Sequence, residues 1–163
     1  MSDIRNFQVC ADLTVNDKWS ELRQSGSDSV ELIWTMQKSI QEDVYGYNFN
    51  EIQSNLGELK KFIDWNEEAI RDEDREFQAA LTGIHTYPNC WKPWKSKHKE
   101  AFSRKLSDLT EDELKELRME WIDKLHFFMN EAIAIGLTPD MITNYYVAKN
   151  EENVKRQSRP GGY

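Results

Sequence analysis

Two pairs of acidic residues stand at a spacing that turns both members of a pair toward the same side of a helix. Glu73 and Glu76 are three residues apart, and so are Glu120 and Asp123. At about 100° per residue, the side of the helix that carries Glu73 also carries Phe77 and is otherwise apolar. Carboxylates without a partner are too costly to keep on an apolar face, so both pairs call for a cation.

The second pair opens a segment, residues 121–137, that is apolar nearly all round, as expected for a helix in the middle of a bundle. Two helices that each turn an acidic pair inward predict a four-carboxylate cage, and all-oxygen cages suit Mg²⁺ or Mn²⁺. A di-iron site would need Glu-x-x-His on two helices, whereas only Asp123-x-x-His126 is present. Acidic pairs are also common on solvated helices, so spacing alone leaves surface decoration open.

Long helices are needed to position these acidic pairs, and the composition of the chain favours a helical protein. The chain has 163 residues, 39% of them hydrophobic, with only seven Gly and four Pro. This balance excludes collagen-like and turn-rich all-β classes. We expect an all-α single helical bundle whose two central helices carry the inward four-carboxylate site. Residues 1–28 are a weakly patterned N-terminal segment, and residues 29–163 form one domain.

Local signals predict where the helices begin and end. Residues 29–44 form one helix, capped by Ser29, and residues 49–81 form a longer pattern interrupted near Gly57 or Asn66. Thr110-Glu-Asp-Glu113 is a capping box that opens a helix reaching residue 135, where Gly136 ends it. Pro139 sits at the first position of a last helix that reaches about residue 155.

The charge balance limits the kinds of partner that the chain is expected to bind. The chain has 21 Lys and Arg against 29 Asp and Glu, a formal net charge of −8. Such a surface repels nucleic acid and anionic membranes, so we expect neither as a partner. We see no apolar run of about 20 residues and no secretory signal. Two cysteines build neither a disulfide framework nor a zinc cluster, so a cytoplasmic location is expected.

A local group of cations and amides nevertheless suits a small phosphorylated ligand. Lys149, Asn153 and Arg156 fall on one face of the last helix, with Asn150 beside them. Aligned cations and amides can bind a row of phosphate oxygens, and Arg can bind two at once. The alternative is an exposed basic helix end that complements the helix dipole. Two lysines near the tryptophans of the central loop can join the row or simply be solvated: Lys92 and Lys95.

Several motifs resemble a known enzyme family. The two acidic pairs are similar to the metal signature of the all-α nucleoside triphosphate pyrophosphohydrolases. The tail Lys149-Asn150-x-x-Asn153-x-x-Arg156-Gln157, with Gly162-Tyr163 at its end, resembles the dimeric dUTPase branch. Three further stretches resemble the T-even-phage-type dCTP pyrophosphatases (dCTPase–dUTPases). They are residues 91–95 (Trp-Lys-Pro-Trp-Lys), residues 122–130 and Tyr145-Tyr146. The resemblance covers roughly residues 30–163, and its last 50 residues are the most specific part.

This resemblance implies a Mg²⁺-dependent hydrolase, with Mn²⁺ as the second metal to consider. It would cleave dCTP, and also dUTP, between the α- and β-phosphates and work as a homodimer, in the host cytoplasm if phage-encoded. The implied metal ligands are Glu73, Glu76, Glu120 and Asp123, with Glu73 also the catalytic base. The tail, including Tyr163, would bind phosphates.

Base recognition is less constrained by the sequence. The resemblance places the amide of Gln37 against the pyrimidine edge, and His126 and Asn130 are further pocket candidates. Each of the three also fits an ordinary structural role. The sequence leaves open a dUTP-only enzyme, a house-cleaning pyrophosphatase for modified nucleotides, and a non-catalytic helical interaction protein of the same fold.

Overall fold

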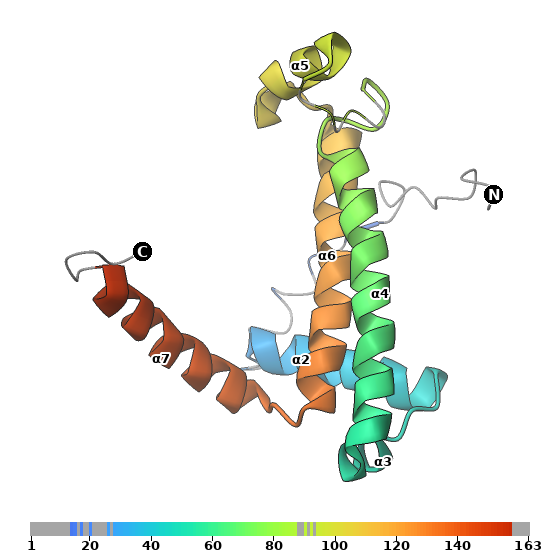
Figure 1. Ribbon diagram of the computed structural model, residues 1–163, viewed down its shortest axis with the longest axis vertical. Coiled ribbons are helices and arrows are strands. Elements are labelled where there is room, and N and C mark those ends of the chain that lie inside the picture. The colour runs from blue at the N-terminus through green and yellow to red at the C-terminus, as the bar shows by residue number, and fades with distance from the viewer. Residues whose placement is uncertain are drawn as a thin grey trace. The chain divides into compact units, whose positions relative to one another are not determined.

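The computed structural model describes residues 14–15, 17, 20, 26, 28–87, 90, 92 and 94–157 (Figure 1). All regular structure in that part of the chain is helical, so the all-α prediction is confirmed. The α-helices are α2 (Ser29–Ser39), α3 (Phe49–Ser54), α4 (Leu56–Ala80), α5 (Ser96–Ser103), α6 (Glu111–Ala134) and α7 (Pro139–Gln157). A π-helical turn, η3 (Ile40–Val44), continues α2, and a 3₁₀ turn, η4 (Leu106–Asp108), precedes α6. None of the described helices combines the length and apolar character that a bilayer crossing requires.

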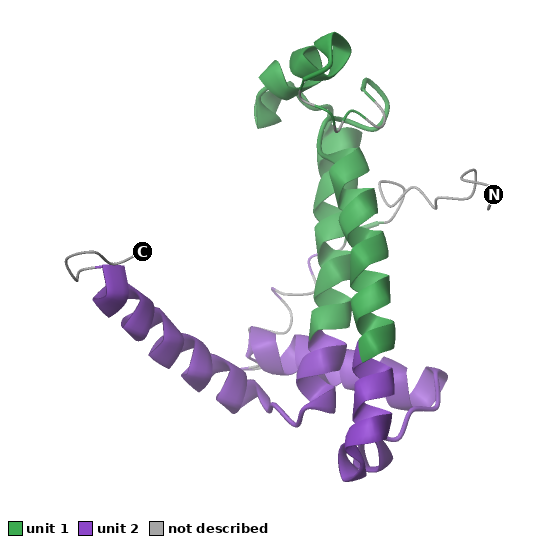
Figure 2. Ribbon diagram, viewed as in Figure 1, with its two compact units in different colours: residues 1–16, 64–128 green, residues 17–63, 129–163 purple. Residues whose placement is uncertain are grey.

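The chain divides into two compact units, shown in Figure 2. Unit 1 contains Met1–Asn16 and Asp64–Phe128, and unit 2 contains Asp17–Ile63 and Met129–Tyr163. Within unit 1, the parts of α4 and α6 that it contains run antiparallel and side by side (Figure 2). The rings of Trp65 and Phe127 meet edge to face across these two helices, with centroids 6.0 Å apart. The prediction of a single domain over residues 29–163 stays a prediction.

The hydrophobic core of unit 2 forms where α3 and the start of α4 meet the end of α6. Its buried members are Phe49, Ile52, Phe62, Ile133 and Ala134. The ring of Phe62 contacts that of Phe49 edge to face at 5.7 Å. Aromatic pairs in this geometry add to the stability that area burial alone provides. The indole N–H of Trp34 on α2 donates to the carbonyl of Leu137 at 2.8 Å, which ties α2 to the connection between α6 and α7.

The structure corrects the predicted cap of α2 and confirms the predicted break of the longer helical pattern near Gly57. The N-cap of α2 is Asp28 rather than Ser29, because the Asp28 carboxylate accepts hydrogen bonds from the backbone N–H groups of residues 30 and 31. The long pattern over residues 49–81 breaks at Asn55, whose side chain accepts from the N–H of Gly57 at 2.7 Å. The alternative break, Asn66, lies fully buried inside α4.

The start of α6 is built around the buried side chain of Glu113. The predicted capping box is present: the Thr110 hydroxyl accepts from the Glu113 N–H at 3.1 Å, and the Glu113 carboxylate accepts from the Thr110 N–H at 3.2 Å. The same carboxylate accepts from the N–H and hydroxyl of Thr86 and from the guanidinium of Arg104 at 3.3 Å. We call Glu113, Arg104, Thr86 and Thr110 the α6 latch, because their bonds join two loops to the first turn of α6.

Gly83 completes the packing around the latch. Its φ of +90° lies in the left-handed region that favours glycine. A Cβ at this position would lie 2.6 Å from Oε1 of Glu113 and 2.7 Å from Nη1 of Arg104. Both the backbone conformation and the space therefore require glycine. Gly136, with φ +78°, ends α6 as predicted.

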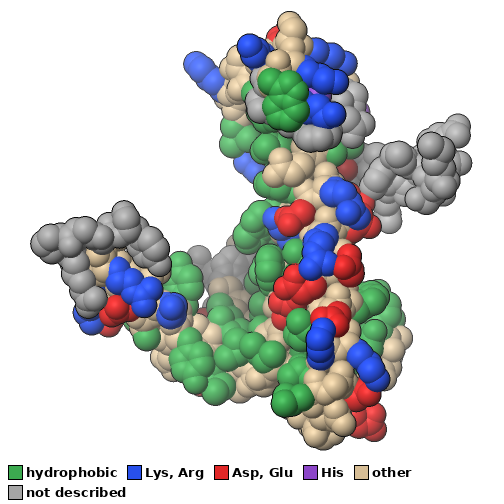
Figure 3. Space-filling model, viewed as in Figure 1, with side chains coloured by type: hydrophobic (Ala, Val, Ile, Leu, Met, Phe, Trp, Pro, Cys, Tyr) green, Lys and Arg blue, Asp and Glu red, His purple; other side chains and the backbone are tan. Residues whose placement is uncertain are grey.

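The prediction that residues 121–137 are buried on all sides is wrong for the described chain. Trp121, Phe128 and Ile135 are 52%, 49% and 56% exposed. The buried side of α6 carries polar groups, including Glu116, Glu120 and Asn130, as well as apolar ones. One side of the helix faces its neighbours, and the apolar residues on the other side reach the surface. Hydrophobic side chains are accordingly visible at the surface in Figure 3.

Candidate metal centre and substrate residues

Three acidic side chains converge between α4 and α6 within unit 1. Glu73 from α4 and Glu120 and Asp123 from α6 each offer a carboxylate oxygen, and these oxygens lie within 4.8 Å of one another. The i, i+3 spacing turns the two α6 residues toward the same neighbour. Hard divalent cations such as Mg²⁺ and Mn²⁺ take oxygen ligands from this kind of group. The structure therefore brings together three of the four predicted ligands.

Glu120 has the environment that most strongly calls for a cation. Its side chain is 5% exposed, and its Oε2 is buried with no hydrogen-bond partner. Burial first, and then the neighbouring carboxylates of Glu76 and Glu116, raise the pKa of Glu120 to about 8. A buried carboxylate oxygen without a donor is rare, because no hydrogen bond offsets the free-energy cost of removing the oxygen from water. A cation bound by the converging oxygens would supply the missing partner.

Glu73 is the second carboxyl with a strongly shifted pKa. Burial, followed by the charges of Glu76 and Asp123, raises its pKa to about 7. A carboxyl group with this pKa exchanges protons near neutral pH, which is the property a general base or acid needs. Perturbed carboxyl groups are found in structural clusters as well, so the shift supports a site here only together with the converging geometry.

Glu76 lies beside the three converging groups rather than among them. Its half-buried carboxyl has a raised pKa, caused first by burial and then by Asp72 and Asp123. Glu116, 2% exposed and one helical turn before Glu120, is a further buried acid next to the cluster. Sequence reasoning missed Glu116 because it considered pairs three residues apart. The i, i+4 spacing to Glu120 was the available signal.

Several other acids of α4 form ion pairs. Arg71 pairs with Glu67 and Glu68, and Arg75 pairs with Asp72. Along α4, Asp and Glu side chains alternate with Lys and Arg at the surface (Figure 3). Asp74 is bound by Lys124, whose Nζ lies 2.5 Å from the carboxylate and 5.0 Å above the ring of Phe77.

Two of the predicted base-reading residues meet inside unit 2. The side-chain amide of Gln37 donates to Oδ1 of Asn130 at 2.6 Å, and these residues are 5% and 0% exposed. Because each amide fixes the orientation of the other, this pair presents a defined pattern of donors and acceptors. His126 belongs to unit 1 and has an exposed side chain on α6.

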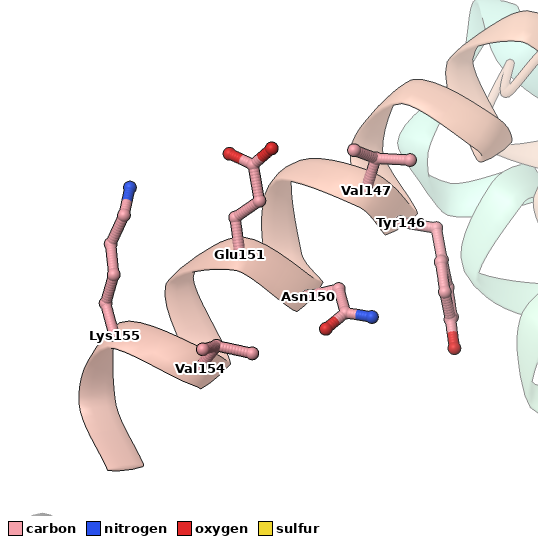
Figure 4. Close-up of a pocket in the computed structure, with 6 residues that line it drawn as sticks. All are labelled: Tyr146, Val147, Asn150, Glu151, Val154 and Lys155. Atoms are coloured by element: carbon pink, nitrogen blue, oxygen red, sulfur yellow. The ribbon is translucent and has the colours of Figure 1, made fainter. Parts of the chain in front are cut away.

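The predicted phosphate-binding residues of the last helix are exposed along α7. They are Lys149, Asn150, Asn153 and Arg156. The guanidinium of Arg156 pairs with the carboxylate of Glu152, one turn earlier, at 3.2 Å. A hollow of about 450 Å³ follows part of this helix, lined by Tyr146, Val147, Asn150, Glu151, Val154 and Lys155. Figure 4 shows Asn150 and Tyr146 on one side of α7 and Glu151 and Lys155 on the other.

The two loop lysines belong to unit 1. Lys95 is exposed, and Lys92 is half-buried. The N–H of Lys92 donates to Nδ1 of His98 at 2.7 Å, which shapes the loop before α5. His98 is half-buried, and this contact gives its imidazole a structural role. Tyr163 lies outside the described residues.

Known proteins similar to this chain include dCTP pyrophosphatases of bacteriophages. The chain is 37% identical over 107 residues to the dCTP pyrophosphatase of Enterobacteria phage LZ5, an alignment that covers 63% of this chain and 62% of the phage LZ5 protein. It is 25% identical over 167 residues to the dCTP pyrophosphatase of Enterobacteria phage T4, covering 93% and 96% of the two chains. The chain is similar to T-even-type dCTP pyrophosphatases. The resemblance read from the motifs is thereby confirmed.

The other comparisons add less. A DNA replication protein of phage T4 is 25% identical over 167 residues, which cover 92% of this chain and 42% of that protein. No protein-family model matches the chain, and no solved structure does. The likeness to the dCTP pyrophosphatases therefore rests on sequence along the chain, and the roles of individual residues rest on the geometry described above.

Proposed function

We propose that the chain hydrolyses dCTP, and also dUTP, to the deoxynucleoside monophosphate and pyrophosphate in the presence of Mg²⁺. The observation that carries this proposal is the convergence of Glu73, Glu120 and Asp123, with a buried oxygen of Glu120 left without a donor. Relatives named dCTP pyrophosphatase, aligned over 63% and 93% of the chain, support the choice of substrate.

The acidic residues have two roles in this proposal. Glu73, Glu120 and Asp123 would hold Mg²⁺ or Mn²⁺, with Glu76 as the fourth ligand expected from the family resemblance. When bound, the metal neutralises phosphate charge and lowers the pKa of a coordinated water. Without a cation these carboxylates would repel a triphosphate, so activity should depend strictly on the metal.

Glu73 is the proposed catalytic base. Its carboxylate is one of the three that converge, so it would lie beside a water held at the metal and could accept a proton from it. The water that it orients would attack the α-phosphorus, which breaks the bond between the α-phosphorus and the bridging oxygen and releases pyrophosphate. Attack at the γ-phosphorus would instead give orthophosphate and a diphosphate.

Residues outside the acidic cluster bind the rest of the substrate. Lys149, Asn150, Asn153 and Arg156 would contact phosphate oxygens, with Lys92, Lys95 and Tyr163 as additional phosphate ligands. Cations and amides suit this role because each can donate hydrogen bonds to an anionic oxygen. Gln37 and Asn130 would read the base, and His126 is kept as a third candidate for the base pocket.

The proposal also includes an oligomeric state and a cellular location. A homodimer is supported by the exposed aromatic side chains of Trp121 and Phe128, since exposed apolar clusters often mark interfaces. The expected surroundings are the cytoplasm of the host cell. A dUTP-only enzyme and a house-cleaning pyrophosphatase remain the alternatives within the same chemistry.

The test measures product release from each candidate substrate. Purified protein is incubated with dATP, dCTP, dGTP, dTTP or dUTP, with and without Mg²⁺, and pyrophosphate and orthophosphate are measured separately. We expect pyrophosphate from dCTP and dUTP only when metal is present. Orthophosphate as the product, or pyrophosphate release that continues in a chelator, would refute the proposed chemistry.

A matched pair of variants tests the site itself. Glu120→Gln removes the buried carboxylate, whereas Glu68→Gln removes an exposed carboxylate of α4 that only pairs with Arg71 at the surface. The first should abolish metal-dependent turnover, and the second should leave it near the wild-type value. Equal activity of the two variants would show that the acidic cluster is not the active site.

A further inference from the structure

A second buried glutamine lies one helical turn after Gln37. Gln41 is 5% exposed, and its Oε1 is buried without a hydrogen-bond partner. Gln37 and Gln41 are spaced i, i+4, and both are buried, so they lie on the same side of the α2–η3 helix. No motif in the sequence analysis singled out Gln41.

The backbone around Gln41 is also unusual. Gln41 belongs to the π-helical turn η3, in which the N–H of Tyr45 donates to the carbonyl of Ile40 at 3.2 Å. The carbonyl of Gln41 accepts from the N–H of Tyr47 at 3.0 Å. η3 forms the last turn of the helix that α2 begins, and π-turns are found at such helix ends. This turn contains the unsatisfied amide oxygen.

A buried acceptor without a donor destabilises the folded chain unless a ligand supplies the donor. The neighbouring Gln37 has its amide orientation set by the 2.6 Å hydrogen bond to Asn130. Gln41 therefore adds an acceptor to an amide pair of defined orientation. Side-chain amides that combine donors and acceptors are the groups that proteins use to read base edges.

We propose that Oε1 of Gln41 accepts a hydrogen bond from the exocyclic amino group of cytosine and so favours dCTP over dUTP. This inference rests on the proposed function, because it concerns the base of the same substrate. Cytosine presents an amino donor at position 4, where uracil presents a carbonyl acceptor. An acceptor on the protein can bind the amino group of cytosine, whereas it repels the carbonyl oxygen of uracil.

The test compares Gln41→Met with Gln53→Met. Methionine has a similar volume and removes the amide. Gln53 is the matched control, because its amide donates to the carbonyl of Ile133 at 3.0 Å in a structural contact of the same unit. kcat/KM is measured for dCTP and dUTP on both variants. For Gln41→Met we expect the dCTP-to-dUTP ratio to fall about five- to tenfold, the effect of one neutral hydrogen bond. For Gln53→Met the ratio should stay at the wild-type value.

A thermal unfolding measurement without nucleotide separates this role from a structural one. Removing a buried amide oxygen that has no donor should leave the melting temperature of Gln41→Met unchanged or raise it, whereas Gln53→Met should melt lower. An unchanged substrate ratio, or a loss of stability in Gln41→Met as large as that of Gln53→Met, would overturn the inference.

A binding readout keeps the inference separate from the proposed function. Calorimetric titration with dCMP and dUMP measures base preference without turnover. Wild-type protein should bind dCMP more tightly than dUMP, and Gln41→Met should lose this preference. If no pyrophosphate is released but the preference is present and depends on Gln41, the proposed function fails and the inference stands. If pyrophosphate is released and the preference does not depend on Gln41, only the inference fails.

Discussion

Replacing Glu113 with glutamine should destabilise the folded chain by about 3 kcal/mol at neutral pH. Burial alone would raise the pKa of Glu113. The hydrogen bonds from Thr86, Thr110 and Arg104 outweigh it and lower the pKa to about 2, from an ordinary value of 4.5. Each pKa unit corresponds to about 1.4 kcal/mol of preference for the ionised form in the folded state. Glutamine also places an N–H₂ group where the carboxylate had an acceptor oxygen. Some hydrogen bonds of the α6 latch are then lost, and two donors face each other in their place.

The sign of the pH dependence follows from this lowered pKa. The folded state binds the Glu113 proton more weakly than the unfolded state does. The carboxylate therefore contributes its full stability above about pH 4.5 and loses it as the pH falls toward 2. The difference in unfolding free energy between wild type and Glu113→Gln should shrink by roughly half near pH 3.

Urea and thermal unfolding followed by circular dichroism measure this difference. For a chain of this size, 3 kcal/mol corresponds to a fall in melting temperature of roughly 6–12 °C. Glu111→Gln is the control, because it removes an exposed carboxylate from the first turn of the same helix. If Glu113→Gln and Glu111→Gln unfolded at the same urea concentration, or if their difference persisted at pH 2, the α6 latch would not have the energetic role assigned here.

Three further outcomes are expected. Glu73→Gln and Asp123→Asn should each remove nearly all pyrophosphate release yet raise the melting temperature without metal, because each relieves repulsion between clustered carboxylates; normal turnover in either would contradict the site. Because the pKa of Glu120 is raised to about 8, its proton competes with metal, so calorimetry should find Mg²⁺ binding stronger at pH 8 than at pH 6; equal affinity would count against Glu120 as a ligand. Arg156→Ala should reduce kcat/KM for dCTP and dUTP alike, by roughly 1.5–3 kcal/mol, whereas Gln37→Ala should change their ratio; the reverse pattern would exchange the two roles.

Features fixed by neighbouring residues could be predicted from the sequence. The capping box of Thr110 and Glu113 and the stop at Gly136 depend on hydrogen bonds within a few residues, and both are present. The convergence of Glu73 with the α6 acids could also be predicted, because helical periodicity decides which side chains share the apolar face.

Features that depend on which helix faces meet could not be predicted. Gln41 and Glu116 look like ordinary polar residues in the sequence, and only tertiary packing buries them. The exposure of Trp121 has the same origin, since an apolar run does not say which side of a helix is covered. The Arg104–Glu113 pair joins residues nine positions apart across a turn, and no periodic pattern marks it.

The tight space at Gly83 constrains how this chain and its relatives can diverge. A Cβ there would lie 2.6 Å from Oε1 of Glu113 and 2.7 Å from Nη1 of Arg104, so any other residue at position 83 forces these two side chains to move. Loss of Gly83 should therefore be accompanied by a rearrangement of the α6 latch. The residues at positions 83, 104 and 113 are expected to vary together. A relative with a larger residue at position 83 is expected to have a different first turn in α6.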